Sequence, residues 1–394
     1  MRRILLVLAV IAVGSLGVVT AATAEGGRTT IAVPAAAQPA AVTAPAAVIS
    51  YTPAAGAAGV QPATKATATV RDGAFDSVTL TDDDGKPVAG EFNADKTVWS
   101  STAPLAYGAS YTWGGSATGA NGAAVPLQGS FATTKPSKRI RGTINIGDGR
   151  TVGIAAPIRI QFNDHVADRA AAERALKVET SVPVEGAWGW LPDEGGGSRV
   201  DWRPKVYWPA NTKVTVTANL RDVFYGGGAV GAANLTSTFQ IGRAQIVKAD
   251  AKSFRMIVIR DGQQVFDFPA SYGLASDPQR NTRSGVHVVS EKFTDKRMVS
   301  QQYGYDSVEK WAVRMSNNGE FIHANPNSAA AQGSANVTHG CVNLSIDNAK
   351  AYYDTALYGD PVEVTNTPIQ LSARDGDIWD WTLSWDKWKA LSAL

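Results

Sequence analysis

The sequence predicts a mainly β protein, with two β-sandwiches, a third β-rich domain and a short C-terminal segment. Over about residues 65–241, short runs of alternating polar and apolar residues lie between turn signals, which is the pattern of antiparallel strands. After about residue 244 the runs become longer and pair across a tight turn, so a different β domain begins there. A chain of 394 residues is also too long for one ordinary hydrophobic core. We therefore expect several domains in series.

The first 24 residues have the pattern of an export signal. Two basic residues, Arg2 and Arg3, precede an apolar run at 4–19, and the small residues at 22–24 fit a signal-peptidase site. The apolar run is also long enough for an uncleaved membrane anchor. No cysteine stands at the end of this run, which excludes a lipid-modified N-terminal cysteine. We expect an exported protein of the periplasm or cell wall, with 1–24 as its signal peptide or membrane anchor.

Residues 25–64 are expected to form a linker. From 31 to 64 the chain is mostly Ala, Pro, Val and Thr without a charged residue, so it has few large side chains to bury, and its prolines keep it extended. The formal net charge of the whole chain is only +2. This small charge gives no indication of a nucleic-acid partner.

Two blocks of short predicted strands follow the linker, at 65–137 and 138–243. They echo each other, because Pro-Val-Ala-Gly ending at Gly90 is answered by Pro-Val-Glu-Gly ending at Gly186. We therefore expect two copies of one β-sandwich. The composition of 167–176, rich in Ala, Glu and Arg, predicts a short helix in the second copy.

Six tryptophans in these blocks could have either of two roles. They could form a strip that stacks on sugar rings, or they could fill the cores of the sandwiches, which is the commoner role of such large rings. We expect the second role for all six: Trp99, Trp113, Trp188, Trp190, Trp202 and Trp208.

The third block, at 244–366, begins with a predicted β-hairpin across Asp261 and Gly262. A helix is predicted after Ser345, which is a good N-cap residue. Further runs typical of strands lie at 286–289, 311–315, 320–322 and 361–364.

The C-terminal segment, 367–394, is unusually rich in tryptophan. Trp381, Trp385 and Trp388 are spaced by four and three residues, so they would share one face of a helix. Three such rings on one face must be buried, and we expect this segment to pack on the third domain.

The third block also holds the only cysteine of the chain, Cys341, and three of its four histidines. His339 lies two residues before Cys341 and His323 eighteen residues before it. Outside the cytoplasm a lone cysteine has no intramolecular disulfide partner, which favours a chemical role. A thiolate nucleophile needs a nearby imidazole to carry its proton. Gly340 would let the chain bend and let a substrate approach the Cys341 amide, a natural oxyanion donor.

Neither of the other two histidines is expected in this site, and a bound metal is not expected there either. His165 is expected in a surface loop, and His287 as a side chain of a strand. Zinc would need His323, His339 and Cys341 as ligands, but two of these lie only two residues apart and no carboxylate stands beside them. We therefore expect no metal and no cofactor. The alternative in which Cys341 is only a small buried apolar residue stays open.

The motif around this cysteine resembles the signature of the L,D-transpeptidases. His323 is followed, after fourteen residues, by Thr-His-Gly-Cys-Val-Asn at 338–343. The whole arrangement over about 65–394 resembles the mycobacterial type of this family, in which two immunoglobulin-like domains precede the catalytic domain. The resemblance implies that 65–137 and 138–243 are immunoglobulin-like domains, 244–366 is the catalytic domain and 367–394 packs on it.

The resemblance also implies a reaction on peptidoglycan stem peptides. Cys341 would attack the peptide bond after diaminopimelate, release D-alanine as it forms a thioester, and pass the acyl group to the amine of a second stem. His323 would carry the proton, oriented by the backbone carbonyl of Ala324. Family members are acylated by carbapenems at this cysteine. Four further residues would shape the oxyanion and substrate region: Thr338, His339, Gly340 and Asn343. Of these, His339 is also expected among the catalytic residues.

One segment departs from the family pattern. Between Gln301 and Trp311, where relatives carry a longer lid with an aromatic residue over the cleft, the chain is short. We expect Tyr303 or Tyr305 to take that place, with Met298 nearby. Two other functions stay open: an L,D-carboxypeptidase, in which water replaces the acceptor amine, and a non-catalytic cell-wall-binding protein.

Overall fold

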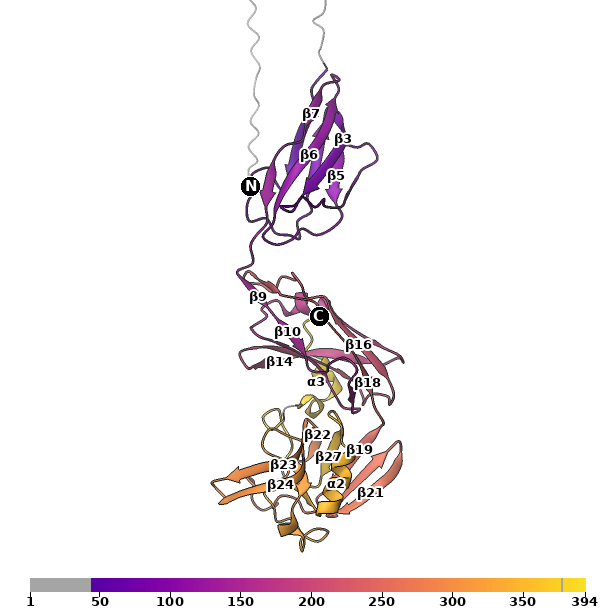
Figure 1. The fold of residues 1–394 in the computed structure, drawn as a ribbon, viewed down its shortest axis with the longest axis vertical. Coiled ribbons are helices and arrows are strands. Elements are labelled where there is room, and N and C mark those ends of the chain that lie inside the picture. The colour runs from indigo at the N-terminus through magenta and orange to yellow at the C-terminus, as the bar shows by residue number, and fades with distance from the viewer. Residues whose placement is uncertain (1–43, 377) are drawn as a thin grey trace, which may run out of the picture. The chain divides into compact units, whose positions relative to one another are not determined.

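The computed structural model describes residues 44–376 and 378–394, and strands dominate them (Figure 1). The expected signal peptide or anchor at 1–24 lies outside the described residues. Among the residues that are described, no helix is long and apolar enough to cross a membrane.

The first β-sandwich consists of two antiparallel sheets. One sheet has the order β1-β2-β5-β4, and in the other β6 pairs with β3, β7 and β8. Its core contains Trp99 and Trp113, each at most 3% exposed. The strands are β1 (Val48–Thr52), β2 (Thr67–Arg71), β3 (Gly73–Thr81), β4 (Gly90–Phe92), β5 (Val98–Ser101), β6 (Ser110–Gly119), β7 (Ala124–Pro126) and β8 (Ser130–Ala132).

The expected linker at 25–64 is too long at its C-terminal end. β1 lies inside it and pairs with β2, with Ile49 opposite Val70. Ile49 and Tyr51 pack against the sandwich core, and Ala47 is buried there. An uncharged composition is compatible with a linker and also with a strand at the start of a sandwich. The alternating large side chains Ile49 and Tyr51 make this segment a strand. The sandwich therefore starts near residue 47 and not at residue 65.

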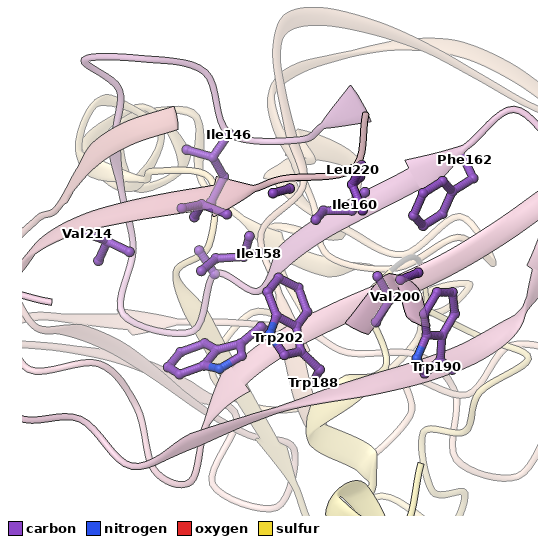
Figure 2. Close-up of a cluster of buried hydrophobic side chains, with 14 of the residues drawn as sticks. Ile146, Ile158, Ile160, Phe162, Trp188, Trp190, Val200, Trp202, Val214 and Leu220 are labelled. Carbon is purple, nitrogen blue, oxygen red and sulfur yellow. The ribbon is translucent and has the colours of Figure 1, made fainter. Parts of the chain in front are cut away.

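The second β-sandwich repeats this architecture. Its sheets have the orders β10-β12-β15-β14 and β11-β18-β16-β13, and the expected helix is α1 (Arg169–Arg174). Ile158, Trp188 and Trp202 belong to its buried cluster (Figure 2). The remaining elements are β9 (Lys138–Ile140), β10 (Gly142–Ile144), β11 (Thr151–Val152), β12 (Ile158–Phe162), β13 (Leu176–Thr180), β14 (Gly186–Glu194), β15 (Gly197–Pro204), β16 (Lys213–Ala218), β17 (Ala229–Gly231) and β18 (Leu235–Ile241).

The echo between the two sandwiches has a packing cause. A Cβ atom on Gly90 would lie 2.0 Å from the ring of Trp99, and a Cβ atom on Gly186 would lie 2.0 Å from the ring of Trp202. In both copies a tryptophan lies over a glycine of the neighbouring strand, where no side chain would fit. All six tryptophans expected in the cores are less than 9% exposed. The prediction of two related sandwiches with tryptophan cores is confirmed.

The C-terminal β domain contains a five-stranded sheet, β21-β20-β19-β27-β22, and a four-stranded sheet, β23-β24-β25-β26. The predicted hairpin and the helix after Ser345 are both present, and Ser345 caps that helix. The elements are β19 (Gln245–Asp250), β20 (Arg255–Arg260), β21 (Gln263–Pro269), β22 (Gly285–Val288), β23 (Glu291–Ser300), β24 (Tyr305–Arg314), β25 (Phe321–Ala324), η1 (Pro326–Ser328), β26 (Val342–Leu344), α2 (Ile346–Thr355) and β27 (Pro361–Thr365).

The strand expected at 311–315 is only the end of a longer one. β24 starts at Tyr305 and pairs with β23 in register from Glu291 to Ser300, which makes a long two-stranded hairpin with its turn at 301–304 (Figure 1). From 305 to 310 the side chains alternate between half-buried and exposed. The exposed face carries mainly charged residues, so the run has too few apolar residues to be recognised as a strand.

The C-terminal segment packs only partly as we expected. Trp388 in α3 (Trp385–Lys389) is fully buried, and its Nε1 donates a 2.9 Å hydrogen bond to the carbonyl oxygen of Ala187 in β14. The Arg203 guanidinium, from β15, lies 4.7–5.4 Å from the ring centroids of Trp381, Trp385 and Trp388.

These contacts place Trp385 and Trp388 on the second sandwich, whereas Trp381 also packs against a cluster that contains Val288 of β22. The start of the segment does pack on the C-terminal β domain: the N–H of Leu371 donates a 2.7 Å hydrogen bond to the carbonyl oxygen of Ser284, and Ile378, just before η2 (Asp380–Thr382), packs against Val288. The spacing of the three tryptophans showed that they need a partner, but it carried no information about which surface offers a flat cation such as Arg203.

Candidate active site

Cys341 and His323 meet because β25 and β26 pair in parallel. His323 lies opposite Asn343 in this register, and Cys341 immediately precedes β26. Residues eighteen positions apart in the sequence are thereby brought to one sheet edge. His323 is 4% exposed, whereas Cys341 is half-buried and reaches a pocket.

The ring of His323 is held by two oxygen atoms. Its Nδ1 lies 2.8 Å from the carbonyl oxygen of Ala324 and 3.3 Å from Oε2 of Glu309. A carbonyl oxygen only accepts hydrogen bonds, so Nδ1 carries a proton and Nε2 is left for Cys341. Burial disfavours the charged ring, but the negative charge of Cys341, a hydrogen bond with it, and Glu309 together raise the pKa of His323 to about 10.

Three polar side chains hold the turn that presents Cys341. Thr338 Oγ1 and Asn343 Nδ2 donate hydrogen bonds of 3.1 and 2.9 Å to the carbonyl oxygen of Cys341. Thr282 Oγ1 donates a 2.8 Å bond to the carbonyl oxygen of Gly340, whose φ of +109° favours glycine. Within 44–376 and 378–394, no group accepts from the N–H of Gly340 or Cys341.

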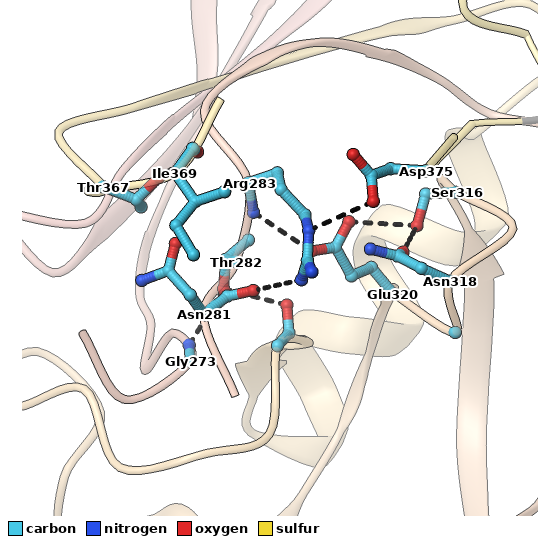
Figure 3. Close-up of polar contacts among 12 residues, drawn as sticks. Gly273, Asn281, Thr282, Arg283, Ser316, Asn318, Glu320, Thr367, Ile369 and Asp375 are labelled. Carbon is cyan, nitrogen blue, oxygen red and sulfur yellow. Dashed lines mark hydrogen bonds and ion pairs between the residues drawn. The ribbon is translucent and has the colours of Figure 1, made fainter. Parts of the chain in front are cut away.

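A polar network centred on the buried Glu320 joins Arg283, Ser316 and Asp375 (Figure 3). The Glu320 carboxyl accepts a 3.0 Å hydrogen bond from the Arg283 N–H and a 2.9 Å bond from Ser316 Oγ. Burial raises the pKa of Glu320. The carbonyl oxygen of Gly319, next to Glu320, lies 3.6 Å from Cys341 Sγ. The network therefore fixes the backbone that backs the thiol.

The pocket in front of Cys341 has a volume of about 210 Å³. The β23–β24 hairpin lines one side of it with Met298 and Tyr305. The ring of Tyr303 does not line the pocket but lies against His339, with centroids 4.5 Å apart. The lining residues are Met298, Tyr305, Ser307, Glu309, His323, Asn325, Asn327, Thr338, His339, Cys341 and Asn343.

His339 has different neighbours from His323. It contacts the rings of both Tyr303 and Tyr305. Burial and the nearby positive charge of Arg280 lower its pKa. Arg280 Nε also donates a 3.2 Å hydrogen bond to the carbonyl oxygen of Thr338. His339 is therefore a neutral aromatic wall of the pocket at neutral pH.

The residues singled out by sequence thus come together, and further ones join them. In the described part of the chain, no three His, Cys, Asp or Glu side chains form a group that could hold a metal ion. Four further residues around the site were not predicted from the sequence: Glu309, Thr282, Arg280 and Glu320. Only Glu309 had a readable signal, since it shares the alternate positions of Tyr305 on one strand.

Comparisons with known proteins identify the family of this chain. The L,D-transpeptidase catalytic domain family matches residues 244–364, and the bacterial Ig domain family matches residues 57–224. Over 351 residues the chain is 52% identical to L,D-transpeptidase 5 of Mycobacterium tuberculosis, covering 89% of this chain and 78% of that relative. The chain belongs to the L,D-transpeptidase family. The predicted fold, two immunoglobulin-like sandwiches followed by an L,D-transpeptidase domain, is confirmed.

Other L,D-transpeptidases are also similar. L,D-transpeptidase 2 of Mycobacterium tuberculosis is 38% identical over 347 residues, covering 86% of this chain and 83% of the relative. The structure of LdtMt1 in complex with imipenem matches with a TM-score of 0.49 and 32% identity, over 58% of this chain and all of that one. A structure of an L,D-transpeptidase from Mycobacterium smegmatis matches with a TM-score of 0.47 and 30% identity, over the same shares.

Proposed function

We propose that this L,D-transpeptidase cross-links peptidoglycan stem peptides through a thioester on Cys341, with His323 as the proton carrier. The observation that carries the proposal is the pairing of a half-buried thiol with a buried imidazole whose pKa is raised to about 10 by the negative charge of Cys341 and by Glu309, against the effect of burial. Such a pair brings a sulfur nucleophile and a proton carrier together in one site.

In the acylation step, the Cys341 thiolate attacks the carbonyl carbon of the peptide bond between diaminopimelate and D-alanine. The N–H groups of Gly340 and Cys341, which bond to nothing else among the described residues, are suited to stabilise the oxyanion. The C–N bond then breaks, and the His323 imidazolium gives its proton to the leaving amine of D-alanine. The products are a thioester, free D-alanine and a neutral imidazole.

In the second step, the side-chain amine of a neighbouring stem attacks the thioester carbonyl. His323 takes a proton from this amine, a new amide bond forms, and the Cys341 thiolate leaves. If water replaces the amine, the product is a shortened stem, as in an L,D-carboxypeptidase. The burial of the six sandwich tryptophans removes them as sugar-stacking sites, which argues against a purely wall-binding function.

The proposed function also implies a location for the enzyme and a class of covalent inhibitors. We place the enzyme outside the cytoplasm, where its stem-peptide substrates lie, on the strength of the N-terminal export pattern. Carbapenems would acylate Cys341, because the thiolate can open a β-lactam carbonyl as it attacks the stem. One relative was solved in complex with imipenem, which supports this expectation.

Product analysis tests the proposed reaction. Purified protein is incubated with a disaccharide-tetrapeptide donor and an excess of acceptor stem, and the products are identified by mass spectrometry. We expect a cross-linked dimer and one D-alanine per cross-link from wild type and from the control His165→Ala, whose side chain is exposed in the second sandwich. Cys341→Ala should give neither. Cross-links from Cys341→Ala would contradict the proposal, and shortened stems alone would identify a carboxypeptidase.

A further inference from the structure

The inner face of the β23–β24 hairpin carries one carboxylate towards the active site. Tyr305, Ser307 and Glu309 are alternate residues of β24, and Met298 of β23 pairs with Ser307, so these side chains share one face. All four line the pocket. The intervening residues Asp306 and Val308 are exposed on the opposite face. The alternation of the strand thus separates a pocket face from a solvent face.

Glu309 is held in place from both ends. Its Oε1 accepts a 2.7 Å hydrogen bond from Ser307 Oγ, and its Oε2 lies 3.3 Å from Nδ1 of His323. The side chains of Glu309 and His323 are only 14% and 5% exposed, so the pair is largely removed from water. An ion pair in such surroundings is screened far less than one on the surface.

We propose that Glu309 is a positioning residue of the transpeptidase reaction, which orients the His323 ring and stabilises its protonated form through Nδ1. The inference rests on the proposed role of Cys341 and His323. Glu309 then acts on Nδ1 of the same ring whose Nε2 is left for Cys341. Glu309 belongs to the β23–β24 hairpin, which lines the pocket. The same hairpin would therefore both form a wall of the pocket and stabilise the positive charge on His323.

Other charged and titratable groups around His323 do not replace Glu309. Cys341 faces the ring from the turn before β26, and Tyr305 of β24 has a raised pKa because of burial and the charges of Cys341 and Glu309. Lys296 of β23 pairs with Glu309 in register, but its Nζ lies over the ring of Phe293, 4.4 Å from the centroid. The hydrogen bond with His323 is the main cause of the lowered pKa of Glu309, so both partners favour the charged pair.

The consequence is a specific pH dependence. Removing the carboxylate charge lowers the pKa of His323, so the imidazolium is lost at a lower pH and the thiolate loses its counter-ion. The alkaline limb of the acylation rate should therefore move to lower pH in Glu309→Gln. An adjacent opposite charge shifts a pKa by about 1–3 units, so we expect a displacement of at least about one pH unit.

The test compares carbapenem acylation rates between pH 5 and 11 for wild type, Glu309→Gln, Glu309→Asp and Asp306→Asn. Absorbance of the Cys341 thiolate at 240 nm is recorded over the same range. Glu309→Gln should show the shifted limb and less thiolate at neutral pH, and Glu309→Asp, which keeps the charge, should recover part of both. Asp306→Asn, on the exposed face of the same strand, should match wild type.

The outcomes separate this inference from the function on which it rests. An unshifted limb in a folded Glu309→Gln, with wild type acylated normally, overturns the role of Glu309 alone. Failure of wild type to be acylated overturns the proposed function itself. If Glu309→Gln does not fold, Ser307→Ala takes its place, because it removes the hydroxyl that holds Oε1. That variant should shift the limb in the same direction by a smaller amount, and no shift would contradict the inference.

Discussion

Thr282 Oγ1 donates a 2.8 Å hydrogen bond to the carbonyl oxygen of Gly340 and accepts a 2.9 Å bond from the N–H of Gly273. This single buried hydroxyl therefore joins a distant loop to the residue before Cys341. The bonds fix the peptide plane between Gly340 and Cys341, and with it the direction of the Cys341 N–H. We therefore expect the reactivity of the Cys341 thiol to depend on Thr282, although Thr282 does not line the pocket.

Replacing Thr282 by valine should slow acylation and destabilise the domain. The isosteric methyl group leaves the Gly273 N–H and the Gly340 carbonyl without their buried partner, which costs about 1–3 kcal/mol per unsatisfied group. Urea denaturation and carbapenem acylation measure the two effects. Thr282→Ser keeps the hydroxyl and should stay close to wild type. Equal behaviour of the valine and serine variants would contradict the role of the hydrogen bonds.

Gly340→Ala should impair acylation more than it impairs folding. A Cβ atom at this position would meet its nearest neighbours at 3.6 Å, an ordinary contact, so the cost comes from the φ of +109°. A non-glycine residue in such a conformation carries about 1–3 kcal/mol of strain, which the turn can relieve by moving the Cys341 amide. Gly147→Ala, with a free Cβ position and no positive φ, is the matched control. An acylation rate equal to that of wild type would contradict this prediction, because it would show that the turn accommodates alanine without moving the Cys341 amide.

Removal of the charge at Cys341 should change the titration of His323. In Cys341→Ala the ring loses its negative neighbour while burial remains, so its pKa falls from about 10. Histidine ring signals in NMR spectra report this directly. In wild type the raised pKa of His323 contributes stability that is fully present below about pH 6.5 and is lost as the pH rises through about 10. A His323 pKa unaffected by Cys341→Ala would show that the two groups are not coupled.

Trp388→Ala should destabilise the second sandwich and its junction with the C-terminal segment. The fully buried ring contacts Gly189, donates to Ala187 and lies against Arg203, so its removal leaves a cavity and an unpaired carbonyl. The loss for a buried tryptophan is about 3–5 kcal/mol. Thermal unfolding measures it, with the exposed Lys387→Ala as control. A melting temperature equal to that of the control would refute this packing.

The sequence allowed the fold to be predicted where periodicity and spacing carry the physical information. Alternating strands, the Pro-Val-Xaa-Gly motif repeated in the two sandwiches, and the spacing of His323 and Cys341 in the sequence are all local or repeated patterns. The surface that the C-terminal tryptophans contact and the start of the first sandwich were not predicted, because both depend on which surface a segment packs against. Glu309 was missed although it alternates with Tyr305 along β24, because only the register of the hairpin shows that this face is directed towards His323.

The central claim, that Cys341 is the nucleophile, is tested most directly by intact mass measurement after incubation with a carbapenem. The thiolate opens the β-lactam ring without releasing a leaving group, so the adduct equals the whole inhibitor in mass. We predict one adduct on wild type, located at Cys341 by peptide fragmentation, and none on Cys341→Ala. An unmodified wild type, or an undiminished adduct on Cys341→Ala, would contradict the account.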